Sequence, residues 1–205
     1  MALKAVCFDV GETLVDEERW WRMLAERSGL QPHVVWAALG VTIDRGEDHN
    51  ELWRHLGVER PTSWTYDLSY ESGDLYPDAI ACLESVRDLG LWVGIIGNQP
   101  EVMERWARDE ALPADVISSS ASLGAKKPDP RFFELVVELT ECDASEVAYV
   151  GDRVDNDVGP ARRNGMRSIW LRRGPWGRLQ RDTNGDAELV VDSLDEFVRR
   201  LPELP

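Results

Sequence analysis

Residues 5–14 read AVCFDVGETL, a short apolar run that ends in a carboxylate and a glycine-containing turn. Four apolar residues before a polar turn predict a buried strand over Ala5–Phe8, because a strand covered on both faces is apolar throughout. Asp9 stands at the carboxyl end of this strand. If the other strands run parallel to it, ligands bind at that end, so the segment predicts a site as well as a strand.

Similar apolar runs recur along the chain and alternate with helical stretches. The further predicted strands are Trp92–Ile96, Val116–Ser118, Val147–Val150, Ser168–Leu171 and Glu188–Val191. The predicted helices between and after them are Asp78–Leu89, Glu101–Glu110, Arg131–Thr140, Asn156–Asn164 and Leu194–Leu201. This alternation predicts an α/β fold with a doubly wound, mostly parallel sheet joined by right-handed crossovers.

Residues 15–76, called the inserted segment below, interrupt this alternation. Glu17–Ser28, Pro32–Leu39 and Asn50–Leu56 are predicted to be helices, and the turn-rich residues 57–73 have no clear assignment. The pattern predicts a small all-helical domain of residues 15–76, inserted in an α/β core made of residues 1–14 and 77–205. Five of the nine tryptophans, Trp64 among them, lie in the inserted segment. We expect most of them to form its core and one or two to face the site.

Composition excludes several classes of partner. The 205 residues include 38 acidic and 23 basic side chains, so the net charge is −15. Nucleic acids and anionic membrane surfaces require positive charge, so neither is expected to bind. We see no apolar stretch long enough for a membrane span and no signal peptide, and we expect a cytoplasmic protein. The three cysteines predict no disulfide framework, and the histidines His33, His49 and His55 are expected at the surface without a role.

Polar residues follow several predicted strands where those strands end. They are Asp9, Gly97, Asn98, Lys127, Asp152 and Asp157. Because the carboxyl ends of parallel strands meet at one edge of the sheet, these residues are expected to converge. Carboxylates packed together repel one another unless a cation neutralises them, and oxygen ligands suit Mg²⁺. Lys127 is positioned to neutralise a bound phosphate or one of the carboxylates.

Four segments resemble the signatures of the haloacid dehalogenase-like hydrolase superfamily, and they occur in the family order. The four are Phe8–Leu14, Ile95–Asn98, Gly124–Pro130 and Gly151–Asp157. The resemblance spans nearly the whole chain and is closest to the phosphatases that carry a helical cap after the first signature. It implies the same α/β core, with the inserted segment as the cap, and hydrolysis of a small phosphorylated metabolite.

The resemblance also implies how the phosphoryl group is transferred. Asp9 attacks the phosphorus atom and forms an aspartyl-phosphate, which water then hydrolyses. Lys127 stabilises the charge on the transferring group, and backbone N–H groups near Gly97 and Asn98 help to bind it.

The same family pattern implies a Mg²⁺ site. The metal ligands are the Asp9 carboxylate, the Gly11 carbonyl and the Asp152 carboxylate. Asp157 acts from the outer shell of this site, where it holds Lys127 or a water bound to the metal.

Two positions depart from the phosphatase pattern. Family phosphatases have an Asp two residues after the nucleophile, which protonates the leaving alkoxide and then activates water, but this chain has Gly11. Their second signature ends in Thr or Ser, where this chain has Gly97. Glu12 is adjacent, but its backbone position is expected to direct it elsewhere. Three activities therefore remain open: a Mg²⁺-dependent phosphatase, a dehalogenase- or phosphonatase-like hydrolase, and a weakly active or non-catalytic relative that binds phosphorylated ligands.

Residues 162–181 contain seven arginines and no acidic residue. One interpretation is a solvated face that balances the acidic remainder of the chain. The other is a positive rim that attracts a phosphorylated substrate, because Arg172 and Arg173 follow a predicted strand.

Overall fold

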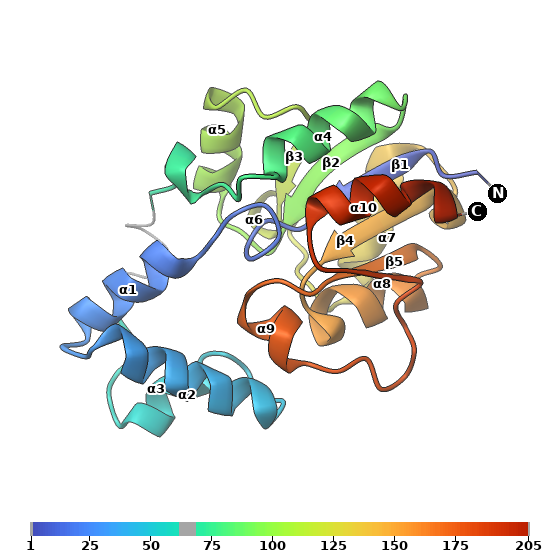
Figure 1. Cartoon of the computed structure of the whole chain (residues 1–205). Coiled ribbons are helices and arrows are strands. Elements are labelled where there is room, and N and C mark those ends of the chain that lie inside the picture. The colour runs from blue at the N-terminus through green and yellow to red at the C-terminus, as the bar shows by residue number, and fades with distance from the viewer. Residues whose placement is uncertain (1, 62–68, 205) are drawn as a thin grey trace.

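The fold is built on six parallel strands. It was obtained as a computed structural model, and the structure describes residues 2–61 and 69–204, so Trp64 lies outside the described residues. The strands are β1 (Ala5–Phe8), β2 (Trp92–Gly97), β3 (Val116–Ser119), β4 (Val147–Gly151), β5 (Arg167–Leu171) and β6 (Leu189–Val191). Their order is β3-β2-β1-β4-β5-β6, and every pairing is parallel (Figure 1). The predicted α/β parallel sheet is confirmed, and β1 lies at its centre.

Helices cover both faces of the sheet. They are α4 (Ala79–Asp88), α5 (Glu101–Asp109), α6 (Ser120–Leu123), α7 (Pro130–Thr140), α8 (Gly159–Arg163), α9 (Gly174–Leu179) and α10 (Leu194–Arg200). Val6 and Phe8 point into a core shared with α4, α5 and α10, whereas Ala5 and Cys7 point into a core shared with α7 and α8. Burial of alternate residues on opposite faces explains why β1 is apolar at every position.

Several short turns of helix complete the core. They are the 3₁₀ turns η1 (Ser72–Asp74), η2 (Ala144–Glu146) and η4 (Leu201–Glu203) and the π-helical turn η3 (Val154–Val158), which leads directly into α8. The predicted helix over residues 156–164 therefore begins earlier, as η3, in the loop after β4. Helix α9 was not predicted, because its first residues, Gly174 and Pro175, are typical of a turn.

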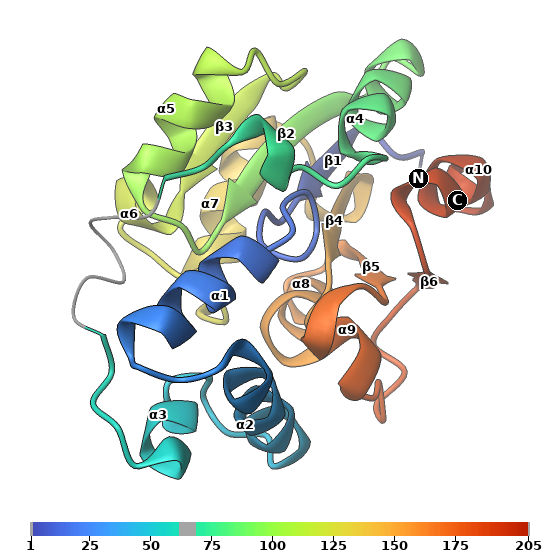
Figure 2. The same ribbon diagram turned by 60° about the vertical axis from the view of Figure 1, so that its left-hand side comes forward.

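The described residues between β1 and α4 form three helices, as predicted. They are α1 (Glu18–Arg27), α2 (Pro32–Asp44) and α3 (Glu51–Leu56), and α2 extends five residues beyond its predicted end at Leu39. Most of their apolar residues form a hydrophobic cluster of their own, but Trp20 of α1 packs into the core of the sheet that includes Phe8. Trp176 of α9 also belongs to the cluster of the inserted helices, so α9 is a further contact between these helices and the sheet. Figure 2 shows α2 and α9 side by side.

The two ends of the inserted segment lie beside each other. Val15 and Leu75 form an antiparallel bridge, and the Asp16 N–H donates to the Asp74 carbonyl at 2.7 Å. Arg19 of α1 donates to both carboxylate oxygens of Asp74, at 2.7 and 2.6 Å. These contacts hold the first and last residues of the inserted segment together beyond the carboxyl end of β1.

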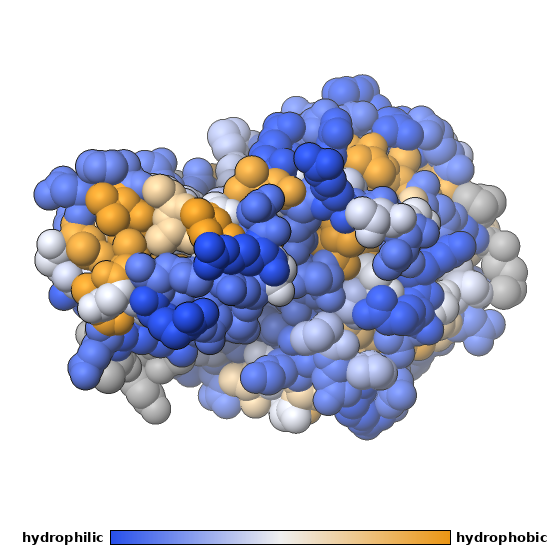
Figure 3. Space-filling model, turned by 90° about the horizontal axis from the view of Figure 1, so that it is seen from below, coloured by the Kyte–Doolittle hydropathy of each residue, from blue (hydrophilic) through white to orange (hydrophobic). Residues whose placement is uncertain are grey.

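The surface over the inserted helices carries exposed apolar side chains. Val41 of α2 is 44% exposed, and Leu179 of α9 is 51% exposed. Figure 3 shows apolar residues gathered on the left of this face, on the side where the inserted helices lie. Among the described residues, no helix has both the length and the apolar character needed to cross a membrane.

Candidate active site

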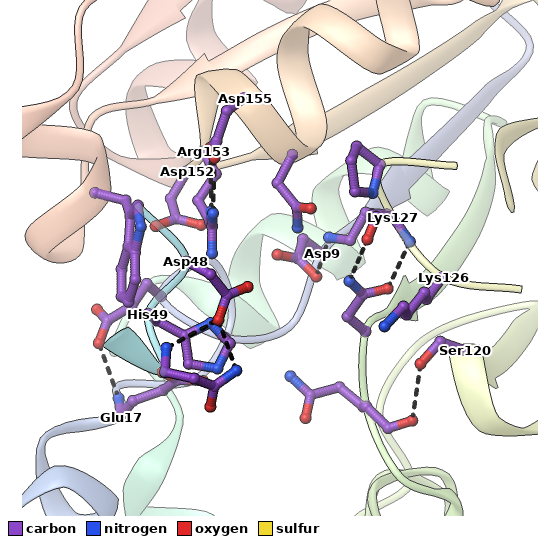
Figure 4. Close-up of a pocket in the computed structure, with 18 of the residues that line it drawn as sticks. Asp9, Glu17, Asp48, His49, Ser120, Lys126, Lys127, Asp152, Arg153 and Asp155 are labelled. Carbon is purple, nitrogen blue, oxygen red and sulfur yellow. Dashed lines mark hydrogen bonds and ion pairs between the residues drawn. The ribbon is translucent and has the colours of Figure 1, made fainter. Parts of the chain in front are cut away.

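A cavity of about 810 Å³ lies at the carboxyl ends of β1, β2 and β4. Residues of the sheet loops and of the inserted segment line it together (Figure 4). The sheet loops contribute Asp9, Gly11, Asn98, Lys127 and Asp152, and the inserted segment contributes Glu17, Trp21, Asp48 and His49. In the view of Figure 4, Glu17, Asp48 and His49 lie across from Lys126 and Ser120. The strand-end residues predicted to converge therefore do so, except that Gly97 and Asp157 lie behind the cavity wall.

Lys127 is buried between two carboxylates. Its ammonium group lies 2.7 Å from Asp9 Oδ1 and 2.5 Å from Asp157 Oδ1, and the residue is 3% exposed. Burial lowers the pKa of Lys127, but the charges of Asp157 and Asp9 outweigh burial and raise the pKa above its ordinary value. The ammonium group is therefore held charged beside Asp9.

Asn98 holds the loop that carries Lys127. Its side-chain amide donates to the Lys127 carbonyl at 2.9 Å and accepts the Lys127 N–H at 2.8 Å. Asn98 thus binds both backbone groups of Lys127, which fixes the start of that side chain at the end of β2. Tyr149 of β4 lies beneath the ammonium group, 5.3 Å from it, and donates its hydroxyl to the Ile96 carbonyl.

Three carboxylates meet at this point. Single oxygen atoms of Asp9, Asp152 and Asp157 all lie within 4.8 Å of one another. Asp152 is 2% exposed, and its Oδ2 has no hydrogen-bond partner among the described residues. Burial, followed by the charges of Asp157 and Asp9, raises the pKa of Asp152 well above its ordinary value. A buried carboxylate without a partner is costly, and a bound cation would remove that cost.

Asp157 uses both of its oxygens within the protein. Oδ1 accepts from Lys127, and Oδ2 accepts the Arg153 N–H at 3.0 Å. Burial and the charge of Asp9 raise the pKa of Asp157, Lys127 lowers it, and the result is about 6. This bonding suits a residue that orients Lys127 and the loop after β4 rather than one that faces a ligand directly.

The space beside Gly11 is filled by a carboxyl group from the inserted segment. A Cβ atom added at Gly11 would overlap Glu17 Oε1 and would lie 3.0 Å from Glu17 Cδ. Burial, then the charges of Glu12 and Asp9, raises the pKa of Glu17 to about 8. Sequence reasoning missed this residue, because a Glu at the start of a helix is normally explained by the helix dipole.

Glu12 lines the same cavity, but its carboxylate is bound by neighbouring residues. Its carboxylate accepts the Tyr76 hydroxyl at 2.6 Å and the Glu17 N–H at 3.3 Å. Its φ of 52° lies in the left-handed region and turns the side chain toward Gly174. A side chain at Gly174 would overlap this carboxylate, so that glycine is required by a close approach.

Gly97 lies directly behind the Asp9 carboxylate. A Cβ atom there would overlap Asp9 Oδ1 and lie 3.3 Å from the Val10 backbone nitrogen. In this arrangement a Thr or Ser at position 97 would displace Asp9, so the departure from the family pattern matches the local packing.

His49 lies in the cavity wall rather than at the open surface, which corrects the expectation for this residue. Burial is the largest influence on its pKa and lowers it. His33 is exposed, as expected, and His55 is half-buried against Glu47. The corner between α2 and α3 brings His49 to the cavity, and no local sequence pattern indicates that corner.

Five of the seven arginines of residues 162–181 pair with acidic residues outside the cavity. Arg162 and Arg167 contact Glu188, Arg172 and Arg178 contact Asp192, and Arg173 contacts Asp78. None of these seven arginines is among the described residues that line the cavity. The structure favours the interpretation in which these arginines balance neighbouring negative charge over the interpretation of a substrate-attracting rim.

Comparison with known proteins adds an independent observation. The sequence profile described as haloacid dehalogenase-like hydrolase matches residues 3–165. The chain is 26% identical to glyceraldehyde 3-phosphate phosphatase of Methanopyrus kandleri, over 98% of each chain. It is 32% identical over 126 residues to the protein of the same name from Methanocaldococcus jannaschii. That match covers 60% of this chain and 54% of the relative, so it spans about half the relative's length.

Solved structures are similar over nearly the whole chain. A phosphatase of the same superfamily from Thermococcus onnurineus matches with a TM-score of 0.63 and 25% identity, over 97% of this chain and 98% of that one. L-2-haloacid dehalogenase from Xanthobacter autotrophicus, with chloropropionic acid covalently bound, matches with a TM-score of 0.71 over 99% and 100%. At 19% identity the second likeness concerns the fold alone.

Proposed function

Because the chain belongs to the haloacid dehalogenase-like hydrolases, we propose that it is a Mg²⁺-dependent phosphatase that acts on a small phosphorylated metabolite through an aspartyl-phosphate on Asp9. The observation that carries this proposal is the buried group of Asp9, Lys127 and Asp152 at the end of β1. It combines a nucleophilic carboxylate, a cation beside it, and a second carboxylate with an unpartnered oxygen. These are the groups that phosphoryl transfer to an aspartate requires.

The residues fit a divalent cation. The three carboxylates and the single ammonium group carry a net charge of −2 when all are ionised, which a divalent ion would neutralise. We propose that Asp9, Asp152 and the Gly11 carbonyl hold Mg²⁺, with Asp157 in the outer shell. All are oxygen ligands, and few protein groups are involved, which suits an ion that retains several waters. When bound, the ion reduces the repulsion between Asp9 and an incoming phosphate.

The remaining groups position the reaction. Asp9 attacks phosphorus, and Lys127 stabilises the negative charge that the transferring group carries. Asp157 keeps Lys127 charged and oriented, and Asn98 fixes its backbone. The Lys127 ammonium group is effective where negative charge develops on the transferring phosphoryl group. Breaking either contact would move it away from that place.

The substrate class follows from the cavity and its walls. About 810 Å³ accommodates a small metabolite, in the range of ordinary ligand pockets. The relatives named above are glyceraldehyde 3-phosphate phosphatases, which supports a short phosphorylated carbon chain as the substrate here. We propose that residues 15–76 form a cap that covers this cavity, excludes water and selects the part of the substrate beyond the phosphate.

Cleavage of a carbon–halogen bond is less well supported. Halide leaves without a proton, so Gly11 alone is compatible with it. That reaction gives no role to the unpartnered oxygen of Asp152 or to the cluster of three carboxylates. Chloride release from 2-haloacids is nevertheless a direct control, and it is measured alongside phosphate release.

The test combines turnover with metal binding. Purified protein is screened for phosphate release from small phosphorylated metabolites, with Mg²⁺ and with EDTA, and calorimetry measures Mg²⁺ affinity. We expect Mg²⁺-dependent release, at least 10-fold weaker Mg²⁺ binding in Asp152→Asn, and unchanged binding in the control Asp155→Asn. Asp155 lies in the same loop but pairs with Arg153. Unchanged affinity in Asp152→Asn would refute the metal site, and tight phosphate binding without turnover would favour a non-catalytic protein.

A further inference from the structure

The proposed reaction needs a proton donor that residue 11 does not provide. A phosphate ester with an alkyl leaving group departs as a strong base unless an acid protonates it, and such an acid contributes about 10²–10⁴-fold to the rate. The chain has Gly11 where family phosphatases carry that acid. A residue from elsewhere in the fold must therefore supply the proton if alkyl phosphates are substrates.

Glu17 occupies the space that the side chain of residue 11 would fill. Its Oε1 overlaps the position of a Cβ atom built on Gly11, and its Cδ lies 3.0 Å from that position. Glu17 lines the same cavity as Asp9 and Lys127. The carboxyl group of Glu17 therefore lies in the same small region beside Asp9 that the carboxyl group of an Asp at position 11 would occupy.

The surrounding contacts hold Glu17 there. It precedes α1 but makes no capping hydrogen bond to that helix, so its side chain is not used by its own backbone. Its N–H donates to Glu12, and Arg19, two residues later, anchors α1 to Asp74 at the base of the inserted segment. Gln99, whose amide lies 3.5 Å from the same Cβ position, bounds the space from the side of β2.

We propose that the Glu17 carboxyl group, carried by the inserted segment, is the general acid and base of this active site and replaces the missing side chain of residue 11. The inference rests on the phosphatase function proposed above. In the first step an Asp9 oxygen bonds to phosphorus, and the bond from phosphorus to the leaving oxygen breaks. The leaving oxygen keeps that electron pair and takes the proton of Glu17.

In the second step the ionised Glu17 takes a proton from water while the water oxygen bonds to phosphorus. The bond between phosphorus and Asp9 breaks, and Asp9 regains its carboxylate. Protons and electron pairs balance over the two steps, and Glu17 ends protonated as it began. The same carboxyl group therefore serves both half-reactions, and it does so only while the inserted segment lies over the site.

The experiment compares leaving groups. Release of the leaving group in a single turnover is measured for glycerol 3-phosphate (or the best alkyl phosphate of the screen) and for p-nitrophenyl phosphate, in the parent and in Glu17→Gln, which keeps the shape of the side chain. We expect Glu17→Gln to slow this first step by about 10²–10⁴-fold on the alkyl substrate and by less than 10-fold on the aryl substrate. Glu18→Gln is the matched control, because Glu18 is exposed and pairs with Arg22. It should leave both rates unchanged.

A transplant of the acid separates chemistry from structure. Glu17→Ala removes the carboxyl group from the space beside Gly11. The double variant Glu17→Ala/Gly11→Asp should hydrolyse the alkyl substrate at least 10-fold faster than Glu17→Ala alone. Gly11 has no positive φ, so an Asp there is not strained. Gly11→Asp alone should not raise the alkyl rate, because Glu17 already occupies the space that the new side chain needs.

The outcomes distinguish the inference from the function on which it rests. A parent that hydrolyses neither substrate contradicts the proposed phosphatase. A parent that hydrolyses both, with equal losses in single-turnover release of the two leaving groups in Glu17→Gln, overturns the role of Glu17 only. If Glu17→Gln fails to fold, the ratio of the alkyl rate to the aryl rate in the parent still tests the proposal. An alkyl rate more than 10³-fold below the aryl rate in the parent would mean that no acid protonates the leaving group.

Discussion

The two walls of the cavity are built in different ways. On the sheet side, Asp9, Lys127 and Asp157 are nearly fully buried and bound to one another, at the ends of strands that the core holds in register. On the inserted side, polar side chains are partly exposed and bind neighbours within the inserted segment, as Glu47 does with His55. The polar side chains of the sheet wall are therefore held more tightly by their neighbours than those of the inserted wall, although both face the same cavity.

The difference separates two tasks. A buried network places charge accurately, which is what bond-making chemistry requires. A wall built largely on its own hydrophobic cluster is less constrained by the sheet, which suits substrate selection. Glu17 crosses this division, because it belongs to the inserted segment by sequence and lies beside Gly11 in space.

The largest effect is expected from removing the charge at the centre of the sheet wall. Lys127→Met leaves Asp9 and Asp157 buried without their common partner. We expect the free energy of unfolding to fall by about 3–5 kcal/mol and turnover to be lost, since a buried charge without its partner is strongly destabilising. Urea unfolding in Mg²⁺-free buffer measures the first effect, and phosphate release measures the second.

Lys126→Met is the matched control for Lys127→Met. Lys126 is the adjacent residue, it is exposed, and it faces the same cavity. We expect its unfolding free energy to change by less than about 0.5 kcal/mol, as for ordinary surface substitutions. Equal losses in the two variants would remove the contrast between a buried network and an adaptable wall.

An intermediate effect is expected where the two walls meet. Trp176 of α9 is 5% exposed and closes the hydrophobic cluster of the inserted helices. Trp176→Ala should lower the stability of those helices by about 3 kcal/mol, because it leaves a cavity at that contact. Hydrogen–deuterium exchange should therefore become faster in α1, α2 and α3 and stay unchanged in β1 and β4.

Trp92→Ala is the control, and we expect it to affect the sheet rather than the inserted helices. Trp92 begins β2 and packs against the core of the sheet on the α7 side. Its removal should accelerate exchange in the sheet and leave the inserted helices unaffected. If both variants accelerate exchange throughout the chain, the inserted segment and the sheet unfold as one unit.

The smallest effect is expected from an ion pair within the inserted segment. A hydrogen bond from His55, followed by its charge, lowers the pKa of Glu47 below its ordinary value of 4.5. The stability that Glu47 contributes is therefore present above pH 4.5 and is lost as the pH falls through the lowered value in the folded state. Glu47→Gln should flatten this part of the stability profile slightly.

A double-mutant cycle with His55→Gln isolates the pair. The double variant should show the same pH profile as Glu47→Gln alone, because either change removes the interaction. Thermal unfolding between pH 3 and pH 6 is sufficient to measure it. A steeper acid loss in Glu47→Gln than in the parent would contradict the sign of the effect.

Much of the sheet wall was predictable because it depends on local patterns. Apolar runs of four or five residues that precede Asp9, Asn98 or Asp152 indicate strands that end in polar residues, and parallel strands bring those ends together. The bounds of β1 agree with the prediction, and those of each other strand differ from it by one residue. Lys127 was placed at the site by its position before Pro128, Asp129 and Pro130.

The inserted wall was predictable only as a set of helices. Periodicity locates α1 and α3 well, but it stops short of the end of α2 and does not indicate α9. Neither His49 nor Glu17 carries a local signal of function, since both are common residues at helix ends. Their place in the cavity depends on how the inserted helices pack against Trp176.

The sequence by itself determined the α/β class and the convergence of the strands' polar ends, with Asp9 and Lys127 among them, because these follow from short-range patterns and the geometry of parallel sheets. Only the tertiary structure decided which group stands beside Gly11. A glycine leaves a space without specifying what fills it, and the carboxyl group that fills it belongs to Glu17, which precedes α1. The packing of α1 against the sheet core and the other inserted helices places that carboxyl group. That position depends on contacts far apart in the chain, which no local pattern encodes.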